Sequence, residues 1–86
     1  MSHTRWWVYI VECKDTTLYT GCTNDLERRI RQHNTSTQGA HYTSLRRPVI
    51  LRYSEECENR SSAQKREYVI KRMTRSEKVA LLRSLT

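Results

Sequence analysis

The sequence contains few of the residues that interrupt regular structure. Gly21 and Gly39 are the only glycines and Pro48 is the only proline, and no internal repeat or low-complexity tract is present. Linkers between domains are usually rich in such residues, so nothing divides the chain. A chain of 86 residues has room for one small hydrophobic core. We therefore expect a single domain over residues 1–86, with its motifs at about 6–73 and a C-terminal helix at about 74–85.

Long hydrophobic runs and paired cysteines are absent as well. No apolar run approaches the roughly 18 residues of a membrane-spanning helix, and the N-terminal residues MSHTRWW lack the hydrophobic segment of a secretory signal. Cys13, Cys22 and Cys57 are odd in number and include no C-x-x-C pair. This pattern argues against a disulfide framework and against a structural zinc site. We expect a cytoplasmic protein with reduced cysteines.

Acidic residues are scarce relative to basic ones. The chain has nine Asp and Glu residues and sixteen Lys and Arg residues, which gives a formal net charge of +7. So large an excess in a short chain favours polyanionic partners through long-range attraction. DNA is the partner we expect, although charge alone does not distinguish it from RNA. The alternative is that the charge only keeps the protein soluble.

The N-terminal third of the chain predicts a β-hairpin. Trp6–Cys13 and Thr17–Cys22 are rich in aromatic and β-branched residues and flank a short polar turn. If the loop between them has three residues, Tyr9 lies opposite Gly21 and Tyr19 shares the face of Tyr9. A two-residue loop would place the two tyrosines on opposite faces of the sheet.

A helix is predicted over residues 24–34. Asn24 is the expected N-cap, with Glu27 as its reciprocal partner in a capping box. Leu26 and Ile30 lie four residues apart and define the apolar face. The chain then continues into a polar segment, Thr35–Arg47, which we expect to be a loop.

The later elements are a strand and two helices. Val49–Ser54 predicts a third strand, and Ser61–Arg72 predicts a helix with Ser61 as its N-cap. Thr74 and Glu77 form another capping box, which opens a last helix that covers the core. The expected order of elements is β-β-α-β-α-α.

Three charged or titratable residues are expected beside the core. Arg29 and His33 border the apolar face of the first helix, and Glu67 lies between Ala63 and Ile70 on the apolar face of the second. A buried carboxylate is costly unless it is paired, so Arg29 or a metal ion is its expected partner. The alternatives are a structural ion pair for Glu67, and Arg29 and His33 side chains that reach out into water.

Basic and aromatic residues are mixed in and near the expected loop. Cations neutralise phosphate while aromatic rings stack on unpaired bases, a mixture typical of nucleic-acid contact. A plain solvated loop is the alternative. The residues expected to contact nucleic acid are Arg28, His41, Tyr42, Arg46 and Arg47.

Together these residues resemble one family. The residues that carry the resemblance are Trp7-Val8-Tyr9, Tyr19-Thr20-Gly21, Thr23-Asn24-Asp25-Leu26, Arg29, His33 with Asn34, and Glu67. In their order and spacing they resemble the GIY-YIG endonuclease domain over about residues 6–73, and most closely its small stand-alone bacterial members. Trp7 and Thr20 replace a glycine and an isoleucine of the family's name. An asparagine that several relatives carry after the glutamate helix has no counterpart between Met73 and Thr86.

The resemblance implies an α+β fold, a small three-stranded antiparallel sheet flanked by helices. It implies an endonuclease, active in DNA repair or recombination, that hydrolyses DNA phosphodiester bonds with one Mg²⁺ or Mn²⁺ ion held by Glu67. Tyr9 would deprotonate or position the attacking water, for which nearby cations must lower its pKa. Tyr19 and His33 would assist in proton handling and phosphate orientation, and Arg29 would stabilise charge on the phosphate.

The sequence leaves two other functions open. The missing asparagine and the absence of further domains also suit a basic nucleic-acid-binding module without turnover. A weaker alternative is an adaptor that binds another repair protein. The target of the domain could be chosen by DNA shape or ends, by a partner protein, or hardly at all.

Overall fold

The computed structural model describes residues 5–35 and 41–84 and has an α+β fold. Its elements in chain order are β1 (Trp6–Glu12), β2 (Leu18–Thr23), α1 (Leu26–Thr35), α2 (His41–Ser44), β3 (Ile50–Cys57), α3 (Arg60–Lys71) and α4 (Arg75–Arg83). The expected order β-β-α-β-α-α is confirmed, with the four-residue helix α2 as an addition inside the segment predicted to be a loop.

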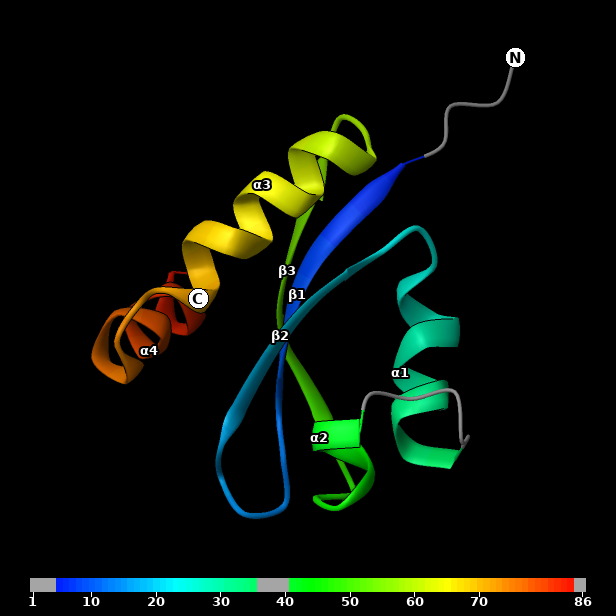
Figure 1. The fold of residues 1–86 in the computed structure, drawn as a ribbon. Helices are drawn as coiled ribbons and strands as arrows, with labels where there is room; N and C mark the ends of the chain where they lie inside the picture. The colour runs from blue at the N-terminus through cyan, green and yellow to red at the C-terminus, as the bar shows by residue number, and fades with distance from the viewer. Residues whose placement is uncertain (1–4, 36–40, 85–86) are drawn as a thin grey trace.

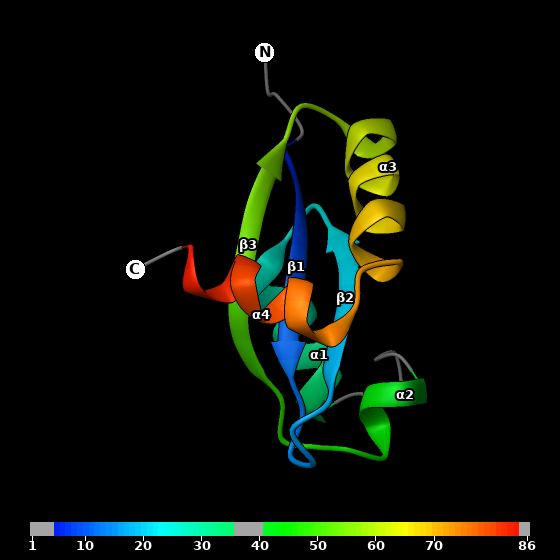
Figure 2. The same ribbon diagram turned by 90° about the vertical axis from the view of Figure 1, so that its left-hand side faces the viewer.

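The three strands form one antiparallel sheet in the order β2-β1-β3. Helix α1 covers one face of this sheet, and α3 and α4 lie on the other (Figure 1). In Figure 2, α4 crosses in front of the strands and α2 lies beside the β2 edge. The expected three-stranded antiparallel sheet flanked by helices is therefore confirmed.

The central strand β1 is buried on both faces, so its side chains supply both halves of the core. Val8 and Ile10 point toward α3 and α4, where Tyr53, Ala63 and Ile70 complete one cluster. The alternate residues of β1 point toward α1 and build a second cluster. The buried members of this second cluster are Tyr9, Val11, Cys13 and Val49. A tyrosine thus occupies a core position on the α1 face.

The β1–β2 hairpin has the register that places both tyrosines on this face. Tyr9 pairs with Gly21 and Tyr19 with Val11, as predicted for a three-residue loop. Thr16, the last loop residue, has a positive φ of 69°, which is typical of such loops. The Asp15 carboxylate accepts hydrogen bonds from the Thr17 backbone N–H (3.2 Å) and hydroxyl (2.6 Å), which stabilise the turn.

Two predicted helix caps are wrong by one or two residues. Helix α1 is capped by Asp25 rather than Asn24, because the Asp25 carboxylate accepts from Arg28 N (3.1 Å). Helix α3 is capped by Asn59 rather than Ser61, because its side chain accepts from the backbone of the third residue on. In both places two cap-forming residues lie close together, and sequence alone does not rank them. The capping box of Thr74 and Glu77 is confirmed.

The third strand is longer than predicted and lies at a sheet edge. It runs from Ile50 to Cys57, and its pairing with β1 contains a bulge beside Ile10 and Val11. Two glutamates in its second half are stabilised by arginines, Glu55 by Arg66 (2.8 Å) and Glu56 by Arg5 (3.2 Å). Among the described residues, no helix is long and apolar enough to cross a membrane.

Thr20 provides a test of the core on the α3 face. It is only 2% exposed, and its hydroxyl has no hydrogen-bond partner within the described part of the chain. Thr20→Val keeps the shape and removes the unpaired hydroxyl, so it should raise the free energy of unfolding by about 1 kcal/mol in urea denaturation. Thr23→Val is the control: the Thr23 hydroxyl accepts from Asp25 N (3.1 Å), so this variant should be less stable. Equal changes in the two variants would contradict the prediction.

Candidate active site

A chain of three hydrogen-bonded side chains lies between the sheet and α1. The Tyr9 hydroxyl is 2.7 Å from Nε2 of His33, and Nδ1 of His33 is 2.7 Å from the Thr43 hydroxyl. Tyr9 is 1% exposed and the other two are fully buried. The chain joins β1, α1 and α2, and the structure brings together the predicted residues Tyr9 and His33.

Gly21 makes room for the Tyr9 ring. It lies opposite Tyr9 in the hairpin, and a Cβ atom at this position would be 2.5 Å from the Tyr9 hydroxyl and 2.7 Å from Cζ. Real Cβ atoms do not come this close to other atoms, so any larger residue would displace the ring. The Tyr9–His33 hydrogen bond therefore depends on a glycine at position 21.

Tyr19 extends the site toward the β2 edge of the sheet. Its ring meets the His33 ring edge to face with centroids 5.4 Å apart, and it stacks on the Tyr42 ring at 5.8 Å. The Lys71 ammonium lies 5.9 Å from the centre of the Tyr19 ring. Arg46 covers the Tyr42 ring at 3.9 Å. Helix α2 thus contributes an aromatic residue to the group of rings around His33.

Burial controls the protonation of the central pair. It raises the pKa of the Tyr9 hydroxyl to about 12, although a hydrogen bond and the charge of Arg29 act in the opposite direction. Arg29 thus acts on this pKa in the direction that the expected role of Tyr9 requires, but burial outweighs it and the net shift is upward. Burial, followed by the charges of Arg29 and Arg47, lowers the pKa of His33 to about 4. At neutral pH the pair consists of a protonated phenol and a neutral imidazole.

Glu67 is on α3, close enough to Tyr9 for its charge to raise the pKa of the phenol. Its carboxylate is 2.8 Å from the Lys71 ammonium and its side chain is 20% exposed. Burial, and after it the neighbouring Glu67 carboxylate, raise the pKa of the Cys22 thiol to about 11. The ion-pair partner of Glu67 in the structure is therefore Lys71, which was not among the expected partners. The described residues contain no group of three or more His, Cys, Asp and Glu side chains able to hold a metal ion.

The residues predicted to contact nucleic acid are in different environments. Arg28 is exposed on α1. Tyr42 belongs to the group of rings described above, and Arg46 covers its ring. Arg46 also forms an ion pair with Asp15 at 3.0 Å. Arg47 donates through Nε to the backbone carbonyl of His33. The side chain of His41 lies outside the described part of the structure.

Sequence reasoning missed two residues of the site. Lys71 follows Glu67 by four residues on a helix, and this spacing could have identified the pair. Thr43 was not identified, because it lies in a polar segment without periodicity. Only the packing of α2 brings its hydroxyl to His33.

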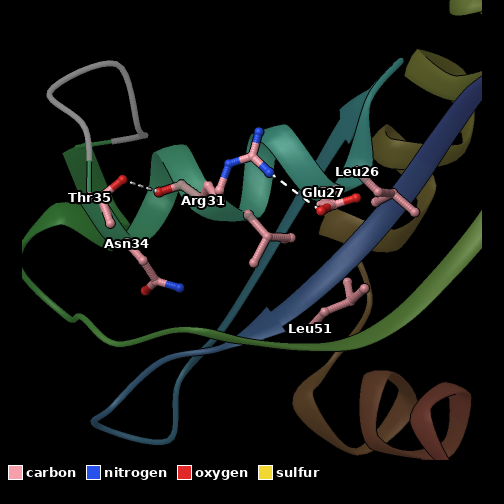
Figure 3. Close-up of a pocket in the computed structure, with 7 residues that line it drawn as sticks. Leu26, Glu27, Arg31, Asn34, Thr35 and Leu51 are labelled. Carbon is pink, nitrogen blue, oxygen red and sulfur yellow. Dashed lines mark hydrogen bonds and ion pairs between the residues drawn. The ribbon is translucent and has the colours of Figure 1, made fainter.

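An apolar groove lies on the other flank of α1, toward β3. It has a volume of 610 Å³, and Figure 3 shows Leu26 and Leu51 facing it from α1 and β3. The charged residues at its border, Glu27 and Arg31, pair with one another at 3.4 Å. The groove contains none of the tyrosine, histidine or Glu67 side chains, so the chemistry of the candidate site lies elsewhere.

The neutral state of His33 predicts a pH dependence of stability. Its pKa is about 4 in the folded protein and about 6.5 in the unfolded chain. Between these values the unfolded chain binds more protons, so the free energy of unfolding should fall by up to about 3 kcal/mol as the pH is lowered from 6.5 to 4. Urea denaturation at pH 7 and pH 4.5 measures the loss. His33→Asn should lack this component, and parallel losses in the two proteins would contradict a buried neutral histidine.

Comparison with known proteins places this geometry in a family. The model of the GIY-YIG catalytic domain matches residues 5–80. A UPF0213 protein of Desulfotalea psychrophila is 53% identical over 79 residues, which cover 92% of this chain and 72% of the relative. A UPF0213 protein of Clostridium perfringens is 54% identical over 78 residues, covering 91% and 83%.

Two solution NMR structures share the fold. One, of a UPF0213 protein from Bacillus halodurans, is 40% identical with a TM-score of 0.59 and covers 95% of this chain and 85% of its own. The other, of a protein from E. faecalis, is 37% identical with a TM-score of 0.63 and covers 94% and 85%. GIY-YIG domains are nuclease domains that generally use a divalent metal ion and act on nucleic acid. The chain therefore belongs to the GIY-YIG family and is similar to its small UPF0213 proteins.

Proposed function

We propose that the protein is a divalent-metal-dependent endonuclease that hydrolyses phosphodiester bonds in DNA. The observation that carries this proposal is the convergence of Tyr9, Tyr19 and His33 on one face of the sheet. Arg29 hydrogen-bonds Tyr9, and Glu67 lies close enough for its charge to act on Tyr9. Phosphodiester hydrolysis needs an oriented water, neutralisation of a crowded anion and a proton acceptor, and these side chains can supply them.

The donor set fits a single hard ion. Within residues 5–35 and 41–84, Glu67 is a single carboxylate outside any cluster of His, Cys, Asp and Glu side chains, and one carboxylate suits Mg²⁺ or Mn²⁺ with several waters retained. Glu67 would hold the ion after exchanging its ion pair with Lys71. When bound, the ion would neutralise phosphate charge and make water more acidic.

The protein's own groups have distinct roles in this proposal. The Tyr9 hydroxyl orients the attacking water and relays its proton toward Nε2 of neutral His33, 2.7 Å away. The guanidinium of Arg29 stabilises the charge that develops on the phosphate. Tyr19 orients the phosphate beside His33. The net charge of +7 attracts the polyanionic substrate, and Arg28, His41, Tyr42 and Arg47 are proposed to contact it.

A nucleic-acid-binding module without turnover is the second candidate. It is favoured by the Glu67–Lys71 ion pair, which occupies the only carboxylate proposed to hold the metal. It is also favoured by the pKa of about 12 at Tyr9, which keeps the phenol protonated. Cleavage assays on DNA and RNA distinguish the two candidates and the two substrates.

Glu67→Gln is the first test of the nuclease. It should reduce metal-dependent cleavage of supercoiled, nicked, branched and single-stranded DNA by about 100-fold or more, because one charged group at the reacting phosphate is lost. Glu27→Gln is a matched control, since it also breaks an i,i+4 ion pair on a helix, with Arg31, but lies beside the apolar groove. Cleavage that survives unchanged in Glu67→Gln would contradict the metal-holding role.

Arg29→Ala separates catalysis from binding. It should lower the cleavage rate by about 100-fold while changing DNA affinity, measured with Ca²⁺ in place of Mg²⁺, much less. The neighbouring exposed residue gives the control: Arg28→Ala should weaken binding and reduce its salt dependence while leaving the cleavage rate of bound DNA intact. If Arg29→Ala only weakens binding, Arg29 is a phosphate contact and not a transition-state group.

A further inference from the structure

Arg46 connects helix α2 to the β1–β2 turn through side-chain and backbone hydrogen bonds. Its Nε donates to the Asp15 carboxylate at 3.0 Å, and its Nη1 donates to the Tyr42 carbonyl at 2.9 Å. Its backbone N–H donates to the Thr43 carbonyl and its own carbonyl accepts from Lys14 N, both at 3.0 Å. One residue therefore connects the turn to two successive residues of α2.

Local hydrogen bonds hold the Asp15 carboxylate, which accepts from Arg46, in a fixed position in the turn. Asp15 accepts from both the backbone and the hydroxyl of Thr17. These bonds, together with the charge of Arg46, lower the pKa of the Asp15 carboxyl, so that it is ionised at neutral pH. The turn thus presents a fixed anion to Arg46.

The other end of the connection is the Thr43 hydroxyl, which contacts His33 from the side opposite Tyr9. Thr43 is fully buried and its Oγ1 is 2.7 Å from Nδ1. A neutral imidazole has one donor and one acceptor nitrogen, and a hydroxyl can serve as either partner. If Nδ1 is the donor, Nε2 must be the acceptor, and the reverse also holds. The hydrogen bond at Nδ1 therefore decides whether Nε2, which faces the Tyr9 hydroxyl, donates or accepts.

We propose that Thr43 is a positioning residue that fixes the orientation and tautomer of His33, and that the Asp15–Arg46 ion pair holds Thr43 in place. Arg46 then belongs to the support of the site and does not bind phosphate, in contrast to the role expected from the sequence. The catalytic consequence rests on the proposed nuclease function. The placement of Thr43 does not, because it is measurable without cleavage.

The Thr43 part of the proposal is tested on the imidazole itself. The ¹⁵N chemical shifts of Nδ1 and Nε2 report the tautomer of His33. Thr43→Val, which keeps the shape and removes the hydroxyl, should change these shifts and lower the cleavage rate about tenfold or more. Thr43→Ser should restore both. Unchanged His33 shifts in a folded Thr43→Val protein would overturn the proposal, whether or not any variant cleaves DNA.

The role of Arg46 is tested by the direction in which two substitutions change DNA binding and the His33 shifts. If Arg46 bound phosphate, removing the neighbouring acid with Asp15→Asn would strengthen DNA binding while Arg46→Gln weakened it. If the ion pair holds α2, both variants should change the His33 shifts and lower the cleavage rate in the same direction, by up to about fivefold for this exposed pair. The double variant should then add little to either.

A second ion pair provides the control for general effects of charge removal. Glu12 and Arg52 pair at 2.8 Å between β1 and β3, with exposures similar to those of Asp15 and Arg46. Glu12→Gln and Arg52→Gln should leave the His33 shifts unchanged. Opposite effects of Asp15→Asn and Arg46→Gln on DNA affinity, with His33 unchanged, would overturn the role of the ion pair. If the His33 shifts change as expected but neither the natural protein nor any variant cleaves DNA, only the nuclease proposal fails.

Discussion

The hydrogen bond between Tyr9 and His33 is the interaction on which the arrangement of the site depends. It crosses the interface between the sheet and α1, and both partners are almost entirely excluded from water. A hydroxyl and an imidazole buried in this way each need a partner, so the two elements have little freedom to slide against one another. The same bond places a proton donor and a neutral acceptor side by side on the face that Tyr19 and Arg29 also reach.

Much of the fold and part of the site could be predicted from the sequence because they follow local patterns. Aromatic and β-branched residues predict the two strands of the hairpin, and a three-residue loop between them places Tyr9 and Tyr19 on one face, although the sequence left a two-residue loop open. Helix α2 could not be predicted, since four residues have no periodicity and are held by a contact with a turn 31 residues away in sequence. The raised pKa of Tyr9 could not be predicted for a related reason: it results mainly from burial, which depends on how closely α1 packs on the sheet.

The charge of the chain and the charge of its site are organised differently. The chain carries a net +7, but two cations near the site are already engaged, Lys71 with Glu67 and Arg46 with Asp15. Cations held in this way fix the positions of side chains, while exposed ones act on a polyanion at long range. The number of basic residues therefore overstates how many are available to contact phosphate.

The close approach of the Tyr9 ring to Gly21 also explains why this chain keeps one residue of the family's name and replaces others. Trp7 stands where the name has its first glycine, on a half-buried stretch of β1, and Thr20 stands for isoleucine on the opposite face from the tyrosines. Thr20 pairs with Ile10 and points away from the Tyr9 ring. The second glycine faces it directly, and a methyl group there would overlap the phenol. The six-letter name thus combines a steric requirement at Gly21 with positions at which this chain has other residues, and a search for its literal spelling would miss proteins such as this one.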